Sequence, residues 1–269
     1  MTGPVPLLRV PGWTDIPGLV HGFGGRRGGV STGPYADLNL SYRVGDDPQA
    51  VRANWGRLRT TIGPDMQCVT MHQVHGAEIA VVSAADEPIG DVDALVSGVP
   101  GLGLCVLTAD CVPILLVAES ERLVAAVHAG WRGTLAGLVT RVVAWLGDRC
   151  GGGAARLRAA LGPAIGGCCY EVDDAIAASV ESRWGRMPAA IRRHGARPAK
   201  AHLDLRAANR ALLTAAGVPA ERVACIGPCT RCTPSEYFSH RGSGVGGSTG
   251  RQASVVGWEN PLGRSARLC

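Results

Sequence analysis

Three apolar runs of strand length follow one another in the middle of the chain, and they constrain the fold more than any other feature. The runs are GLCVLTAD, VPILLVA and RLVAAVHA, all within residues 103–129. The turn ESER between the last two predicts a hairpin. The first two meet at Asp110 and Cys111, which we read as the centre of another buried hairpin. With 269 residues, 46% of them hydrophobic, the chain can bury a sizeable core around these strands.

Helical patterns lie on both sides of these runs. Residues 46–63 have an aspartate N-cap, a proline in the first turn and a final glycine, which together predict a helix. Apolar spacing predicts a second helix over 134–149, and further helices are expected over 173–184 and, capped by Asp204, over 205–217. Because helices alternate with strands and hairpins also occur, we expect an α/β (α+β) protein with mixed sheets rather than a doubly wound parallel fold.

Charge and composition argue against several classes of function. The net charge is +5, but the arginines are scattered rather than clustered, so we expect no nucleic-acid partner. The longest apolar stretch, 102–118, is interrupted by Asp110 and Pro113 and is shorter than the roughly 20 residues of a membrane span, so no membrane partner is expected. The first twenty residues lack the apolar core of a secretion signal, so the ten cysteines are expected to be reduced, in a cytoplasmic protein. The oligomeric state is left open.

Two histidines and a cysteine lie at the ends of predicted strands. His75 precedes the strand AEIAVV, Cys111 follows the first apolar run, and His128 ends the third. Side chains at neighbouring strand ends can converge, and one thiolate with two imidazoles suits zinc. Three protein ligands leave a fourth position for water or substrate, as in a catalytic site. From spacing alone, a lone histidine on an apolar strand is more often a satisfied core residue than a metal ligand.

Several sequence blocks, in order from His21 to Gln252, resemble one known family. The blocks are HGFGGRRGGVSTGPYADLNLS, QVHG, TADCVPILL, AAVHAGWRGT, LGPAIGGCCYEV and CTRC…YFSHRG…TGRQ. They are similar to the YfiH-like family, whose members are described as multicopper (laccase-like) polyphenol oxidases, purine nucleoside phosphorylases and peptidoglycan editing factors. The resemblance implies that His75, Cys111 and His128 bind the metal. It also implies a single YfiH-like domain over 1–269, with layers in the order α-β-β-α.

The resemblance further implies a zinc enzyme that acts on purine nucleosides. The implied reactions are phosphorolysis of adenosine, inosine and methylthioadenosine, with phosphate as co-substrate, and deamination of adenosine. A zinc ion lowers the pKa of bound water, and attack on C6 of adenine then needs an acid or base for the leaving ammonia. Asp110 or Asp93 could be this acid or base. Alternatively, Asp110 orients a ligand histidine and Asp93 belongs to a turn.

Phosphate requires an anion site, and glycine-rich loops with an arginine suit it. Three arginines in such loops are candidates, although each could also be structural: Arg26, Arg241 and Arg251. The chain departs from the family at Trp55, where an arginine is usual. If that arginine binds phosphate, phosphorolysis is weakened here, or Arg52 or Arg57 takes its place.

Other interpretations remain open at this point. The older family name implies a copper oxidase of phenols, and copper can bind a Cys/His site. However, seven histidines are fewer than a multicopper laccase uses, and no His-x-His pair is present. A Cys–His hydrolase of peptidoglycan precursors would use Cys111 as nucleophile and His128 or His75 as base. Nothing in the sequence favours a protein that only binds partners.

The remaining cysteines look structural. Cys229 and Cys232 form a CxxC, which alone could be half a zinc site or a redox pair. Since no second CxxC is present, we interpret them as structural thiols. The adjacent Cys168 and Cys169 are expected to pack in a tight loop.

Overall fold

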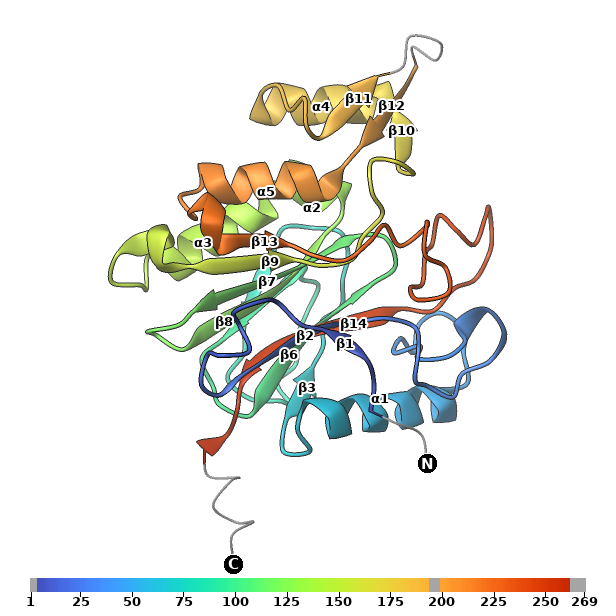
Figure 1. The fold of residues 1–269 in the computed structure, drawn as a ribbon, viewed down its shortest axis with the longest axis vertical. Coiled ribbons are helices and arrows are strands. Elements are labelled where there is room, and N and C mark those ends of the chain that lie inside the picture. The colour runs from blue at the N-terminus through green and yellow to red at the C-terminus, as the bar shows by residue number, and fades with distance from the viewer. Residues whose placement is uncertain (1–3, 194–198, 262–269) are drawn as a thin grey trace, which may run out of the picture.

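The computed structural model describes residues 4–193 and 199–261, and in it two β-sheets lie face to face (Figure 1). The five-stranded sheet has the order β1 (Leu7–Leu8), β2 (Leu19–Gly24), β14 (Gln252–Trp258), β6 (Leu102–Thr108), β3 (Gln67–Val69). The six-stranded sheet has the order β13 (Val223–Cys225), β9 (Arg158–Leu161), β7 (Val112–Ala118), β8 (Leu123–Ala129), β5 (Ala94–Ser97), β4 (Ile79–Val81). Both sheets combine parallel and antiparallel pairs.

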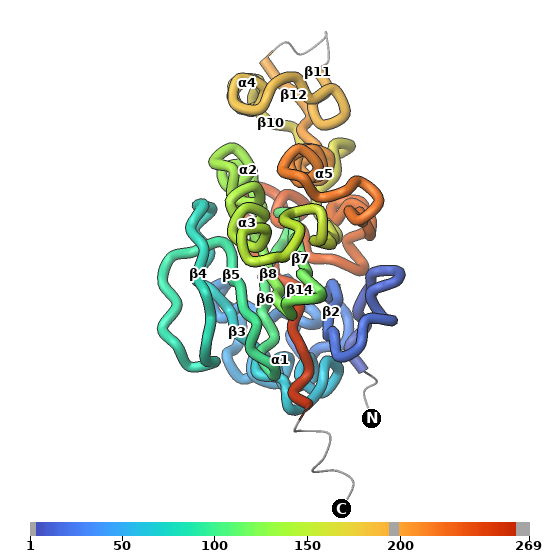
Figure 2. Tube along the Cα trace, turned by 90° about the vertical axis from the view of Figure 1, so that its left-hand side faces the viewer, coloured from blue at the N-terminus to red at the C-terminus, as the bar shows by residue number. Residues whose placement is uncertain are grey.

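Helices cover both outer faces (Figures 1 and 2). Helix α1 (Pro48–Ile62) packs on the five-stranded sheet, whereas α2 (Trp131–Leu135), α3 (Leu138–Gly147) and α5 (Leu205–Ala215) cover the six-stranded sheet. Beyond them, α4 (Asp174–Trp184) lies against a small sheet of β10 (Glu171–Asp173), β12 (Lys200–Leu203) and β11 (Ile191–Arg193). The described residues also form three short 3-10 helices: Gly33–Tyr35, Gly153–Arg156 and Ala220–Arg222. The expected mixed-sheet α-β-β-α architecture is confirmed.

The central strands are buried on both faces, which explains their nearly continuous apolar sequence. In β7, Ile114 and Leu116 pack toward the helices, while Leu115 and Val117 pack between the two sheets. All seven residues of β7 are buried. No helix among the described residues has the length and apolar character needed to cross a membrane.

One of the two expected hairpins is confirmed and the other is wrong. Strands β7 and β8 pair antiparallel, with Val112 opposite Ala129. Strand β6 pairs instead with β14 and β3, so the chain passes from one sheet to the other at Asp110, whose φ is 90°. Doubly buried strands look alike in sequence, so the apolar pattern could not show to which sheet each one belongs.

The predicted helices are confirmed except for one. The side chains of Asp47 and Asp204 cap α1 and α5, each accepting a hydrogen bond from a backbone N–H. The helix predicted over 134–149 is two helices, α2 and α3, and begins earlier, at Trp131. Gly137 separates them with a φ of 78°, a left-handed conformation that glycine adopts without strain.

Candidate metal centre

Strand pairing brings His128 and Cys111 together. Pro113 of β7 lies opposite His128 of β8, so Cys111, two residues earlier, lies beside the end of β8. His75 comes from the loop between β3 and β4, and its Nε2 is 3.8 Å from the Cys111 Sγ. The imidazole rings of His75 and His128 meet edge to face, with their centroids 4.8 Å apart. One potential ligand atom from each of the three residues lies within 4.8 Å of the others.

A buried carboxylate, Asp93, orients this group. It directly precedes β5, which pairs with β8, and its side chain is fully buried. Its Oδ1 lies 2.7 Å from the His128 Nδ1 and accepts a hydrogen bond from the His75 backbone N–H at 3.0 Å. Its Oδ2 accepts from the backbone N–H groups of Gly76 at 2.6 Å and Val74 at 3.2 Å. With Nδ1 of His128 committed to Asp93, the Nε2 of His128 is the ring nitrogen available to a metal.

The charges of these residues act on one another. Burial raises the pKa of the Cys111 thiol, but the facing imidazoles of His128 and His75 outweigh it and bring the pKa to about 6. Burial likewise disfavours protonated His128, yet Cys111 and Asp93 raise the pKa of His128 to about 9. Burial raises the pKa of Asp93 as well, but hydrogen bonds from His128 and Gly76 hold it below its ordinary value. The two imidazoles therefore favour the thiolate form of Cys111, the form that binds metals.

The backbone leaves room for the three ligands to close on one ion. A Cβ on Gly130 would lie 2.9 Å from the Cδ2 of His75 and 3.2 Å from the Sγ of Cys111, so only glycine permits this approach. His75 itself has a φ of 61°, which is rare for a residue with a side chain. One thiolate and two imidazoles in this arrangement fit zinc and can also accept copper.

The three candidate ligands line a cavity of about 1230 Å³. Its wall contains six arginines: Arg43, Arg52, Arg59, Arg132, Arg241 and Arg251. Four large aromatic side chains also line it: Tyr42, Trp55, Trp131 and Tyr170. The cavity therefore combines a candidate metal centre, several positive charges and flat apolar surfaces.

The three arginines predicted from glycine-rich loops lie in different surroundings. Arg241 and Arg251 line the cavity. Burial lowers the pKa of Arg251, while the negative charges of Cys111 and Asp110 act in the opposite direction. Arg26 lies outside the cavity wall, where its guanidinium donates to the carbonyls of Ala36 and Pro234 at 2.6 and 2.7 Å. That position gives no support to a phosphate-binding role for Arg26.

The two candidate aspartates have different surroundings in the structure. The hydrogen bonds of the Asp110 side chain go to residues other than His75 and His128. Its carboxylate accepts hydrogen bonds from the hydroxyl of Thr230 and the backbone N–H of Arg241, both at 2.6 Å. Asp93, for which a turn was the alternative, is the aspartate that contacts His128. Sequence reasoning missed this because strand pairing, rather than local spacing, places Asp93 beside β8.

Several cavity residues were not singled out from sequence. Arg132 and Trp131 follow directly after the HAG of His128, and Tyr170 follows the cysteine pair, so proximity to the quoted blocks was the available signal.

Trp55 lines the cavity and donates from its indole Nε1 to the Leu40 carbonyl at 2.9 Å. Of the two proposed substitutes for the missing arginine, Arg52 lines the cavity and Arg57 does not.

Fold and site thus define a layered α-β-β-α protein with a Cys/His candidate metal centre in an arginine-rich cavity. A family model described as multi-copper polyphenol oxidoreductase laccase matches residues 20–259, and the chain belongs to this family. The similarity to YfiH-like proteins is confirmed.

Three relatives illustrate the similarity. A purine nucleoside phosphorylase of Deinococcus radiodurans is 40% identical over 259 residues, which cover 96% of this chain and 95% of that protein. Adenosine deaminase RL5, from an unknown prokaryotic organism, is 37% identical over 239 residues, with 84% and 90% covered. The crystal structure of YlmD from Geobacillus stearothermophilus superposes with a TM-score of 0.84 at 35% identity, covering 96% of this chain and 100% of that one.

Replacing Asp93 should weaken metal binding more than any change at a neighbouring exposed acid. In Asp93→Asn the negative charge is lost and one oxygen becomes a donor that faces backbone N–H groups, so we expect zinc affinity to fall about 10- to 100-fold. Competition with a chelating dye measures it, and Cys111→Ala defines the signal that other sites contribute.

The matched control is Asp91→Asn. Asp91 pairs with His72 at 2.6 Å, but both side chains are exposed and neither is among the candidate ligands. The Asp91→Asn protein should bind zinc as the wild type does. Equal affinities for Asp93→Asn and wild type would show that the buried carboxylate does not support the centre.

Proposed function

We propose that this protein is a zinc-dependent enzyme of purine nucleosides, which cleaves adenosine, inosine and methylthioadenosine with phosphate and also deaminates adenosine. The observation that carries the proposal is one cavity that holds the candidate metal ligands together with six arginines. The relatives named purine nucleoside phosphorylase, and RL5, named adenosine deaminase, support this substrate class.

Phosphate would bind beside the candidate metal centre, where cationic side chains surround Tyr170. The guanidinium carbon of Arg241 lies 5.0 Å from the centre of the Tyr170 ring. Burial raises the pKa of Tyr170 to about 12, with the charge of Cys111 adding to it and the charges of Arg241 and Arg132 opposing it. Tyr170 therefore keeps its proton at neutral pH. Two guanidinium groups and a hydroxyl donor suit a phosphate dianion.

The purine nucleoside would occupy the rest of the cavity. Ligand pockets typically measure about 300–1,000 Å³, so a cavity of about 1230 Å³ has room for a nucleoside and a phosphate together. The rings of Trp131 and Tyr170 offer flat apolar surfaces for a purine. At Trp55, where an arginine is usual in the family, the cavity has an aromatic ring in place of a positive charge. This position therefore favours binding of the purine base over binding of the phosphate.

In phosphorolysis, a phosphate oxygen bonds to C1′ of the ribose while the C1′–N9 bond breaks, and the purine leaves with the electron pair and takes up a proton. In deamination, water oxygen adds to C6 and the amino group leaves as ammonia. His75, Cys111 and His128 would hold the zinc ion, which supplies a Lewis acid and lowers the pKa of bound water. The arginines bind and orient the phosphate, and the aromatic side chains offer surfaces on which the purine can stack.

We assign Asp110 a positioning role in this scheme. Its two carboxylate oxygens each accept a 2.6 Å hydrogen bond, from Thr230 and from the backbone of Arg241. The carboxylate thereby sets where Arg241 lies on the cavity wall.

A Cys–His hydrolase is the second candidate, and one observation favours it. The Cys111 Sγ lies 3.8 Å from the His75 Nε2, and the neighbouring imidazoles lower the pKa of the Cys111 thiol, as in activated cysteine nucleophiles. The copper-oxidase interpretation gains less support. Among the described residues, potential metal ligands gather at two places, and histidines occur at only one of them.

Product analysis of adenosine, with and without phosphate, tests the proposed function. Wild type should form adenine and ribose phosphate only when phosphate is present, and inosine without it. Cys111→Ala should lose both activities, because the thiolate ligand is gone. A wild-type protein that forms none of these products, or a Cys111→Ala protein that keeps full activity, would contradict the proposal. Cleavage of peptidoglycan precursors by the metal-free protein would favour the hydrolase.

Removing the guanidinium of Arg132 should impair phosphorolysis much more than deamination. A charge-assisted hydrogen bond is worth about 1.5–3 kcal/mol, so Arg132→Ala should raise the KM for phosphate about tenfold or more, with little effect on the KM for adenosine in deamination. Arg141→Ala is the control, since Arg141 lies outside the cavity and pairs with exposed Glu78 at 3.1 Å. Equal phosphate KM values for Arg132→Ala and Arg141→Ala would remove Arg132 from the anion site.

A further inference from the structure

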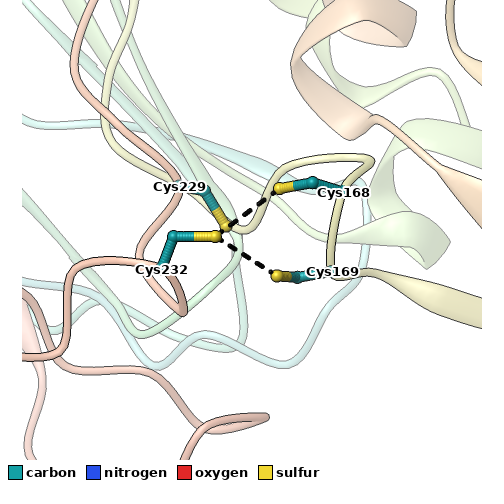
Figure 3. A group of neighbouring side chains, drawn as sticks. All are labelled: Cys168, Cys169, Cys229 and Cys232. Atoms are coloured by element: carbon teal, nitrogen blue, oxygen red, sulfur yellow. Dashed lines mark hydrogen bonds between the residues drawn. The ribbon is translucent and has the colours of Figure 1, made fainter.

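A second group of potential metal ligands lies away from the His75 centre. Four cysteine side chains converge from two loops: Cys168, Cys169, Cys229 and Cys232 (Figure 3). The first pair lies in the loop between β9 and β10, and the second lies in the chain between β13 and β14. All four sulfur atoms lie within 4.8 Å of one another. The sequence interpretation of the CxxC as structural thiols did not identify the adjacent pair as its partner.

The distances between the sulfur atoms fit one tetrahedral ion. The Sγ of Cys232 lies 3.7 Å from that of Cys168 and 3.4 Å from that of Cys169. Four thiolates around zinc, each about 2.3 Å from the ion, are about 3.8 Å apart. All four residues are free thiols in the structure. Their spacing thus matches shared coordination of one ion.

The surrounding backbone supports the thiolates. The N–H of Gly166 donates to the Sγ of Cys229 at 3.2 Å, a contact that orients a ligand sulfur and stabilises its charge. A Cβ on Gly166 would lie 3.3 Å from the Cys168 Sγ and 3.4 Å from the Cys229 Cβ, so glycine lets the two loops close here. Arg231, inside the CxxC, donates to the Cys169 carbonyl at 3.3 Å and joins the same loops.

We propose that Cys168, Cys169, Cys229 and Cys232 bind one zinc ion in a closed tetrathiolate site, separate from the centre at Cys111. Four protein ligands leave no position for water or substrate, so the role of this site is structural. Zinc here crosslinks two loops whose attachment points lie about sixty residues apart in the chain. Because the site exists only in the folded chain, the free energy of zinc binding stabilises the folded state.

The crosslink lies behind one wall of the cavity. Tyr170, adjacent to Cys169, lines the cavity from the first loop. Thr230, adjacent to Cys229, donates from its backbone to the Ala164 carbonyl at 3.1 Å and from its hydroxyl to Asp110. The proposed ion therefore holds Tyr170 and the Thr230–Asp110 contact in fixed positions relative to each other.

Zinc content per chain tests the proposal independently of any enzymatic activity. The full-length protein, purified under reducing conditions with zinc, should lose one zinc ion per chain in the double variant Cys168→Ser/Cys232→Ser. The exposed Cys225, on β13, lies outside the cluster, so Cys225→Ser should keep the wild-type content. Cys111→Ala should lose a different ion, so combining it with the double variant should leave no zinc.

A second readout does not depend on the folding of the double variant. Wild-type protein reconstituted with Co²⁺ should show the intense sulfur-to-metal charge-transfer absorption of a tetrathiolate site, and Cys111→Ala should retain most of it. Equal zinc content in the double variant and the wild type would overturn the proposal. Iron in place of zinc, or disulfides among the four cysteines by mass spectrometry of the reduced preparation, would overturn it as well.

Discussion

The carboxylate of Asp93 joins two parts of the site that are distant in sequence, and the candidate metal centre depends on it. It accepts hydrogen bonds from the backbone of residues 74–76, which positions His75, and it contacts the Nδ1 of His128. A fully buried carboxylate is costly unless each oxygen is satisfied, so these partners are held firmly in place. Strand pairing between β5, β8 and β7 then brings Cys111 to the same point.

Much of the architecture could be predicted because it follows local rules. The N-caps Asp47 and Asp204 marked two helices, and the apolar runs marked the central strands. The prediction that β6 and β7 form a hairpin was wrong. The sequence of a strand that is buried on both faces does not show which sheet the strand joins. The break at Gly137 was missed, because the apolar residues on either side keep nearly the same helical spacing.

The site was predictable to the extent that the family resemblance named its residues. The resemblance implied the set of His75, Cys111 and His128, and the structure brings these three together. Residues that reach the site through tertiary contacts had no local signal. Asp93 acts across a strand pair, and Cys168 and Cys169 meet Cys229 and Cys232 only across two loops. Arg132 differs, because it lies in α2, which begins two residues after β8 ends, and so stands close to His128 in the sequence.

The proposed centre requires three side chains to share one ion, and anomalous diffraction at the zinc edge tests this most directly. In crystals of the zinc-loaded, full-length protein, we expect an anomalous peak about 2.3 Å from the Cys111 Sγ and about 2.0–2.1 Å from one ring nitrogen of each of His75 and His128. A map of catalytically active crystals with no peak among these three residues would contradict the account.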